Sequence, residues 1–410
     1  MSTIAHDPPL FPMERANPLD PPAAYAQLRQ EAPLVRVRLW DGSSAWLATR
    51  SQDVRAVLVD PRFSADGSVA GFPMISAARR SLLTAGSPQL AQLDPPDHTR
   101  LRKALAGEFT FKRIEALRPF VAGTVAQLLE AMVKQGPPLD FVENFALKLP
   151  SMVISKLLGV PYEEHEFFEE CSRRRVALDV DPHVPVQAGK DMAAYCDRLL
   201  RQKERDPDAS DDLLSRLARD QILPGHLTHE EGVSLANQLV MAGHETTANM
   251  IALGTLSLIL CPEELAKLQA DPALTASAVE EMLRYHTIVH FSIARIAKED
   301  VEIGGQRIAR GEGLFVLITA ANRDPGSFTD PDRFDVARKT RNHFAFSFGI
   351  HQCLGQALAR LEMQEVFAVL FRRLSDLRLA VPFDALSFKH RNMVYGVHQL
   401  PVVWGERGAG

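Results

Sequence analysis

The chain has 410 residues, of which 46% are hydrophobic and 24% are charged, and its formal net charge is −5. This composition is typical of a globular protein with a sizeable core, and length alone favours more than one domain. The small negative charge argues against nucleic-acid binding, and four cysteines without close pairs argue against a disulfide scaffold. We therefore expect a protein of a reducing, cytoplasmic compartment.

The first 22 residues contain six prolines together with Asp7, Glu14 and Arg15. A signal peptide would instead open with a basic segment followed by an apolar one, so we expect none. Residues 250–261 form the most apolar later run, which is too short to span a bilayer. We expect no membrane segment.

The N-terminal part predicts one hairpin followed by a helix. Residues 34–48 alternate apolar and polar side chains and break at Asp41-Gly42, which is typical of a β-hairpin. Residues 51–58 favour a helix with Ser51 as its cap. Residues 60–93 are rich in Gly, Pro, Ser and Arg and predict an irregular segment.

Two prolines before Asp97 mark the start of a further helix, on which His98 and Arg102 are four residues apart and share one face. Taken alone, the pair is typical of a solvated helix face. Amphipathic helical spacing continues over residues 112–158, interrupted at 136–138 by Gly-Pro-Pro. Residues 161–187 are acidic and then basic, and carry no motif.

A very long helix is predicted from the capping box of Thr228 and Glu231 to about residue 261, before Pro262. Its middle reads Ala-Gly-His-Glu-Thr-Thr over residues 242–247. Gly243 weakens the helix there, and the Thr246 hydroxyl can hydrogen-bond to the preceding turn. The segment is either a packing glycine beside a polar face or an acid and an alcohol suited to relaying protons.

Helices are predicted over residues 262–270 and 274–285, and strands with two glycine turns over residues 288–318. In the second helix Glu281 and Arg284 are three residues apart, so they can pair on one face. Exposed pairs of this kind contribute less than about 1 kcal/mol.

Residues 346–362 predict a glycine-bearing loop that enters a helix, with Cys353 at the junction. A helix start favours the thiolate, and Gly349 and Gly355 permit close approach of a flat group. The alternatives are a buried structural cysteine, or a zinc site with His351, for which further ligands are missing. A papain-like nucleophile would carry a family signature that is absent.

The spacing Phe346-x-x-Gly349-x-x-x-Cys353-x-Gly355 resembles the haem-binding loop of the cytochromes P-450. Residues 242–246 resemble the oxygen-activation element of that family. Glu281-x-x-Arg284, together with Pro-Asp-Arg-Phe at residues 331–334, resembles its structural brace. The resemblance runs in the family's order from about residue 17 to residue 404.

The resemblance implies a mainly α fold, in which a helix-rich haem domain at residues 17–404 is joined by a smaller β-rich region. Residues 1–16 are expected to form an extended Pro-rich segment and residues 405–410 a tail. The implied cofactor is heme b (iron protoporphyrin IX), with Cys353 as the axial iron ligand. The implied cofactor-binding residues are His98, Arg102, Ala242, Arg295, Phe346, Gly349, His351, Cys353 and Gly355.

The resemblance also assigns roles around the cofactor. Thr246 is implied to hydrogen-bond the bound dioxygen, and Glu245 to deliver protons through water. Glu281, Arg284 and Arg333 are implied to brace the cysteine loop without taking part in catalysis. We expect the substrate pocket to be lined by Leu239, Ala242, Val289, Phe291, Met393 and Val394, with polar contacts from His290 and Ser292.

The implied function is that of a soluble, bacterial-type monooxygenase, which inserts one oxygen atom from O2 into a lipophilic small molecule. A ferredoxin and a ferredoxin reductase are the implied electron donors, and we expect a cytoplasmic monomer. The alternatives are an enzyme similar to the fungal nitric-oxide reductases or a peroxide-using relative, both of which should lack the acid and alcohol pair. A haem-binding sensor without turnover is the alternative from a different class.

Overall fold

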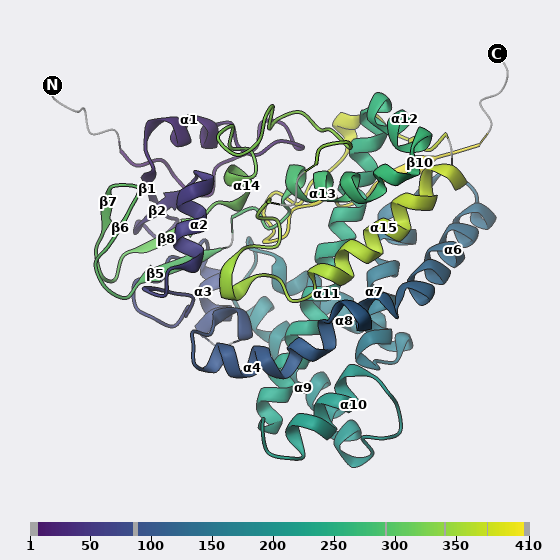
Figure 1. Cartoon of the computed structure of the whole chain (residues 1–410), viewed down its shortest axis with the longest axis horizontal. Helices are drawn as coiled ribbons and strands as arrows, with labels where there is room; N and C mark the ends of the chain where they lie inside the picture. Colours follow the sequence, from purple (N-terminus) through teal and green to yellow (C-terminus); the bar gives the residue numbers. More distant parts are fainter. Residues whose placement is uncertain (1–6, 85–88, 292, 340–341, 375, 406–410) are drawn as a thin grey trace.

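The computed structural model describes residues 7–84, 89–291, 293–339, 342–374 and 376–405. Helices make up most of it, and the main sheet lies to one side (Figure 1). The α-helices of the described residues are α1 (Ala24–Glu31), α2 (Ser51–Val59), α3 (Ala77–Thr84), α4 (Asp97–Ala106), α5 (Phe111–Glu115), α6 (Arg118–Gln135), α7 (Lys148–Leu158), α8 (His165–Val176), α9 (His183–Arg205), α10 (Leu213–Leu217), α11 (His229–Leu260), α12 (Pro262–Ala270), α13 (Thr275–His286), α14 (Ile318–Ala321) and α15 (Gln356–Arg373).

The strands form three small sheets. They are β1 (Leu34–Arg38), β2 (Ser44–Ala48), β3 (Phe63–Ser64), β4 (Leu139–Asp140), β5 (Ala294–Ala297), β6 (Val301–Ile303), β7 (Gln306–Ile308), β8 (Gly313–Val316), β9 (Arg378–Leu379) and β10 (Pro401–Val403). The main sheet has the order β1-β2-β8-β5-β3, and the others are β4-β10-β9 and β6-β7. The predicted hairpin is confirmed, with Leu34 opposite Ala48. Because β8 runs parallel to β2, this sheet joins the N-terminal hairpin to a segment that lies more than 260 residues later in the sequence.

Helix α2 begins where it was predicted, but the expected cap is wrong. The Ser51 hydroxyl donates to the carbonyl of Ala321 at 2.7 Å instead of capping its own helix. The Asp324 carboxylate accepts from the Ser51 backbone N–H at 2.8 Å. A tertiary contact 273 residues away therefore satisfies this helix end, and local sequence does not reveal it.

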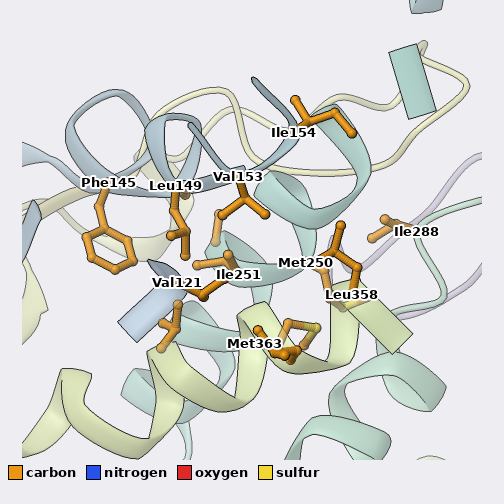
Figure 2. Packing of buried hydrophobic residues seen from close by; sticks show 14 of the residues in the cluster. Val121, Phe145, Leu149, Val153, Ile154, Met250, Ile251, Ile288, Leu358 and Met363 are labelled. Atoms are coloured by element: carbon orange, nitrogen blue, oxygen red, sulfur yellow. The ribbon is translucent and has the colours of Figure 1, made fainter. Parts of the chain in front are cut away.

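Helix α11 is the centre of the hydrophobic core. It packs against α7, α8, α9, α13 and α15. Figure 2 shows Leu149 and Val153 of α7, Ile251 of α11 and Met363 of α15 in one cluster, and all four side chains are buried. The capping box predicted at its start is present, with Thr228 accepting from the Glu231 N–H at 3.2 Å. The helix also ends where Pro262 predicted.

One stretch of helix, Phe111–Gln135, has the length and hydropathy of a membrane span. Its apolar residues Val121, Val125, Leu128 and Met132 are buried in the same core as α7 and α15, the two helices that α6 packs against. A helix of a globular protein that packs one apolar face into the core can have the same composition, so this single stretch is weak evidence of a membrane span.

The capping box offers a test of how α11 is held. Thr228→Ala leaves the Glu231 N–H without its acceptor and should lower the free energy of unfolding by about 1 kcal/mol. Thr110→Ala is the matched control, because Thr110 also precedes a helix but its side chain makes no capping hydrogen bond. Urea denaturation of both variants measures the difference, and equal losses would contradict the assignment.

Candidate active site

The loop before α15 is folded by its own backbone and presents Cys353 to a cavity. The Cys353 N–H donates to the Phe346 carbonyl at 2.9 Å, and Ser347 and Gly349 have φ angles of 61° and 74°. A side chain at Gly349 would also strike the Leu58 carbonyl oxygen, which lies 2.5 Å from the position of its Cβ. Glycine is therefore required there by both conformation and space. Packing does not require it at Gly355, where a Cβ would meet no described protein atom within 4 Å.

Burial raises the pKa of the Cys353 thiol, while the Gly355 backbone N–H, Arg102 and Arg360 act to lower it. Burial therefore opposes the thiolate that the sequence predicted, whereas the groups around the loop favour it. Helix α15 begins three residues later, at Gln356, so only its outermost N–H groups reach the sulfur. A bound metal ion would reverse the balance, because a coordinating thiol is deprotonated. Among the described residues no three His, Cys, Asp or Glu side chains form a metal site, which leaves the zinc alternative without ligands.

Cys353 opens onto an apolar cavity of about 390 Å³. Helix α11 contributes Leu239, Ala242 and Thr246 to the wall, and the segment after α13 contributes Val289. Ile288 and Ile293, from the segment expected to line the pocket, are also in the wall, and the lining residues that the sequence did not single out for it are Leu90, Leu235, Ile318, Leu358 and Met363. The cavity thus has a sulfur on one side and a hydroxyl-bearing helix among apolar walls.

Basic side chains gather at one edge of this cavity. His98, Arg102 and His351 line it, and Arg295 lines a neighbouring cavity together with His351. Burial lowers the pKa of His351 to about 3, with Arg295, His98 and Arg102 adding to the effect. Burial also lowers the pKa of Arg295 to about 10. The rings of His98 and His351 lie 4.3 Å apart, and the Nδ1 atom of each is buried without a partner.

The positive charges of Arg102 and Arg295 disfavour protonation of both imidazoles, and a bound anion would remove this repulsion. Arg102 and Arg295 supply permanent positive charge, and the two orphaned imidazole nitrogens supply donors if they are protonated. A group that carries two carboxylates, with a flat apolar body over Cys353, therefore fits the edge and the floor of the cavity. Iron protoporphyrin IX has this chemistry, and Gly355 leaves room beside it.

Thr246 and Glu245, which are adjacent in sequence, lie on different faces of α11. The Thr246 hydroxyl lines the cavity and donates to the Ala242 carbonyl at 2.8 Å, as the sequence predicted. Glu245 is 5% exposed and does not line the cavity. Its carboxylate accepts from Asn249 at 2.7 Å and from Lys389 at 3.3 Å. Burial acts to raise its pKa, but Lys389 and the other neighbours lower it overall.

Asn249 and Lys389 were missed by sequence reasoning. Asn249 is one helical turn after Glu245, so this contact could have been found from the spacing. Lys389 lies 144 residues further along the chain, and no local sequence pattern indicates its contact with Glu245. Gly396 makes room for the group, because a Cβ there would lie 1.8 Å from the Asn249 amide oxygen.

Glu281 and Arg284 form a fully buried ion pair through two hydrogen bonds of 2.8 Å. Arg284 also donates to the backbone carbonyls of Asn322 and Pro331. The prediction that Arg333 is the third member of this brace is wrong, because its side chain is 61% exposed and lies 4.0 Å from the Glu264 carboxylate. Arg338 takes that place, 3.1 Å from the Glu281 carboxylate. Arg333 contributes only its backbone carbonyl to Arg284.

A second buried acid, Glu280, was not predicted. Burial acts to raise its pKa, but hydrogen bonds from His343 and Arg360 lower it to about 2. The Arg360 guanidinium also lies 4.5 Å from the centre of the Phe346 ring. Glu280 and Glu281 together connect α13 to both flanks of the cysteine loop.

Three of the expected pocket residues do not line the cavity. Phe291 and Met393 pack in a separate cluster around the main sheet, and Val394 is buried in the main core. Val394 forms an isolated β-bridge with Val289, whose side chain does line the cavity. His290 is also turned away and bonds to the Asn392 carbonyl at 2.8 Å. Ser292 lies outside the described residues.

The chain is similar to known proteins over almost its whole length. A model of the family Cytochrome P450 matches residues 184–379. Cytochrome P450-SU2 of Streptomyces griseolus is 47% identical over 404 residues, or 98% of each chain. Pentalenic acid synthase of Streptomyces avermitilis is 45% identical, covering 98% of this chain and 99% of the other. The crystal structure of mycinamicin VIII C21 methyl hydroxylase from Micromonospora griseorubida, bound to mycinamicin VIII, is 40% identical, with a TM-score of 0.91 over 97% of this chain and 100% of that one.

Unfolding experiments can test whether Arg338, and not Arg333, is the second cation that pairs with Glu281. Arg338→Gln removes the second cation on a buried carboxylate and should lower the free energy of unfolding by about 1.5 to 3 kcal/mol. Arg333→Gln changes an exposed side chain and should stay within about 0.5 kcal/mol of the parent. Guanidinium denaturation measures both, and a larger loss for Arg333→Gln would restore the original expectation.

Proposed function

The chain belongs to the cytochrome P450 family and is a haem-thiolate monooxygenase, and we propose that Cys353 is its iron ligand and that its substrate is a lipophilic small molecule. The observation that carries this proposal is the placement of Cys353 and Thr246 in one apolar cavity, with basic residues at its edge. The family's cofactor is heme b, which supplies the activation of dioxygen when bound. The similarity to named hydroxylases supports hydroxylation as the reaction.

The protein's own residues divide the work around the cofactor. We propose that His98, Arg102, Arg295 and His351 hold the two propionates, because they form the basic edge of the cavity. The bound carboxylates would raise the pKa of each imidazole toward its ordinary value, so that both histidines could donate. Apolar residues such as Leu239 and Val289 would exclude water and orient the substrate.

Thr246 and Glu245 are proposed to move protons into the cavity. The Thr246 hydroxyl can release the Ala242 carbonyl and present its proton to the cavity. Glu245 is held on the far face of the helix by Lys389 and Asn249, so it must rotate away from them before it can deliver a proton. The low pKa that Lys389 imposes keeps Glu245 ionised until that movement, after which burial favours uptake of a proton.

The surface beside the cysteine loop supports a ferredoxin as electron donor. Ile350 of the loop is 49% exposed and Phe111 of α5 is 77% exposed. Lys103 and Lys112 are exposed nearby on α4 and α5, and neither pairs with a carboxylate of the described residues. An apolar centre with basic neighbours suits a small acidic redox protein, since complementary charge steers such encounters.

We further propose that residues 17–404 act as one haem domain and that the enzyme is a cytoplasmic monomer. The largest hydrophobic cluster extends from Leu90 to Val402, and the pairing of β2 with β8 joins the N-terminal part to it, which supports the first point. All four cysteines are free, which supports a reducing compartment.

The proposed reaction can be tested with isotopic oxygen. The purified holoprotein, a surrogate ferredoxin, its reductase and a nicotinamide donor are incubated with lipophilic compounds under labelled dioxygen. The proposal predicts a product that carries one labelled oxygen atom, with the second atom in water. Product whose added oxygen comes from water, or no labelled product under conditions in which added hydrogen peroxide does give product, would contradict it.

The role of Thr246 makes a separate prediction. Thr246→Ala removes the hydroxyl that lines the cavity, so oxygen consumption should continue while most of the reducing equivalents appear as hydrogen peroxide instead of product. The control is Thr255→Ala, because Thr255 is buried on the same helix away from the cavity. An oxygen electrode with a peroxide assay measures the ratio, and unchanged coupling would remove Thr246 from the proton path.

A further inference from the structure

A second cavity, of about 430 Å³, lies between α3, α9 and the first turns of α11. Two arginines face it, Arg79 from α3 and Arg175 from the end of α8. We refer to it as the arginine cavity. Its apolar lining residues are Leu82, Leu83, Val186, Ala193, Ala194 and Val233. A charged group can therefore sit here beside an apolar body.

Neither guanidinium has an acidic partner among the described residues. Arg175 is 9% exposed and donates to the Asn237 amide oxygen at 2.9 Å. The Arg79 side chain makes no hydrogen bond or ion pair within the described chain. Burial lowers the pKa of Arg79 to about 10, and the positive charge of Arg175 adds to this effect. Two partly desolvated cations without a counter-ion are costly, and an anion between them would remove that cost.

The carboxylates that also line the arginine cavity are otherwise engaged or exposed. Asp197 pairs with His229 at 2.8 Å and with Arg201 at 3.0 Å. Glu230 is exposed in the first turn of α11. Lys190 adds a third cation to the lining.

The neighbouring arginines do have partners. Arg80 forms an ion pair with Asp41, and Arg174 lies 4.0 Å from Asp191. Arg79 and Arg80 are neighbours on α3, and Arg174 and Arg175 are neighbours on α8. In each pair, the arginine that faces the cavity is the one without an acidic partner among the described residues.

The arginine cavity adjoins the cavity at Cys353. The short helix η1 (Leu90–Gln92) contributes to both: Leu90 and Ala91 line the central cavity, while Gln92 lines the arginine cavity. Arg79 and Gln92 also line a third cavity, of about 250 Å³, which reaches His351 of the cysteine loop. Ala91 and Ile293 line both this third cavity and the central one, so an anionic end at Arg79 would place an apolar part against the wall that the central cavity shares.

We propose that Arg79 and Arg175 bind the carboxylate of the substrate, which is accordingly a lipophilic acid. This inference rests on the proposed monooxygenase function and narrows its substrate class. Guanidinium groups suit the task because their planar donors match the two oxygens of a carboxylate. Asn237 fixes the orientation of Arg175, and Arg79 brings the charge to the junction between the cavities.

The test compares acids with their neutral esters. Dodecanoic, hexadecanoic and abietic acid, each with its methyl ester, are titrated into the holoprotein, and binding is followed by the Soret shift and by calorimetry. At least one acid should bind about tenfold or more tightly than its ester, the ratio expected for one charge-assisted contact. Arg79→Gln and Arg175→Gln should each remove most of this preference, and Arg175→Lys should restore part of it.

Arg80→Gln and Arg174→Gln are the matched controls and should leave the preference unchanged. Equal affinity for every acid and its ester would overturn the inference. So would a loss of haem from Arg79→Gln with parallel weakening of acid and ester, because Arg79 would then be a propionate contact. The reduced carbon-monoxide spectrum of the same protein separates the two proposals: a normal thiolate spectrum with no acid preference leaves the monooxygenase standing and refutes the carboxylate site alone.

Discussion

The buried ion pair between Glu281 and Arg284 is the constraint on which the rest of the site depends. Both side chains are fully buried, so removing either partner would leave an uncompensated charge in the core. Arg284 uses its remaining donors on the carbonyls of Asn322 and Pro331, and the Asn322 side chain accepts from the Phe344 N–H at 2.7 Å. The pair thus fixes α13, the irregular segment after α14 and the first residues of the cysteine loop relative to one another.

With the loop held in this way, the charges around the cavity are divided by position. Cationic groups collect at the edge, where His98 and His351 lack acceptors for their buried nitrogens. The one acid of the central α11 motif, Glu245, is kept out of the cavity by Lys389. The walls between them are apolar. The site is therefore arranged to take up an anionic, flat cofactor and an apolar reactant, while its own acid stays neutralised on the other side of the helix.

Local patterns predicted the helices well and the packing partners poorly. The capping box at Thr228 and the proline at residue 262 give the bounds of α11 because both act within one turn. Arg333 was preferred to Arg338 because a motif names a position, whereas hydrogen bonds from the Arg338 side chain to the carbonyls of Thr329, Asp330 and Arg333 hold that residue beside Glu281. Phe291 was placed in the pocket by proximity in sequence, but in the sheet cluster it packs edge-to-face against Phe11. Lys389 and Glu280 depend on contacts across the fold, which spacing does not encode.

The central claim is that Cys353 binds the haem iron as a thiolate. The most direct measurement is the carbon-monoxide difference spectrum of the reduced protein, recorded for the parent, for Cys353→Ala and for Cys261→Ala as a remote, partly buried cysteine. If Cys353 is the iron ligand, the parent and Cys261→Ala will both show a strongly red-shifted Soret band, and Cys353→Ala will lack it. The same band in Cys353→Ala, or a reconstituted parent that takes up no haem, would contradict it.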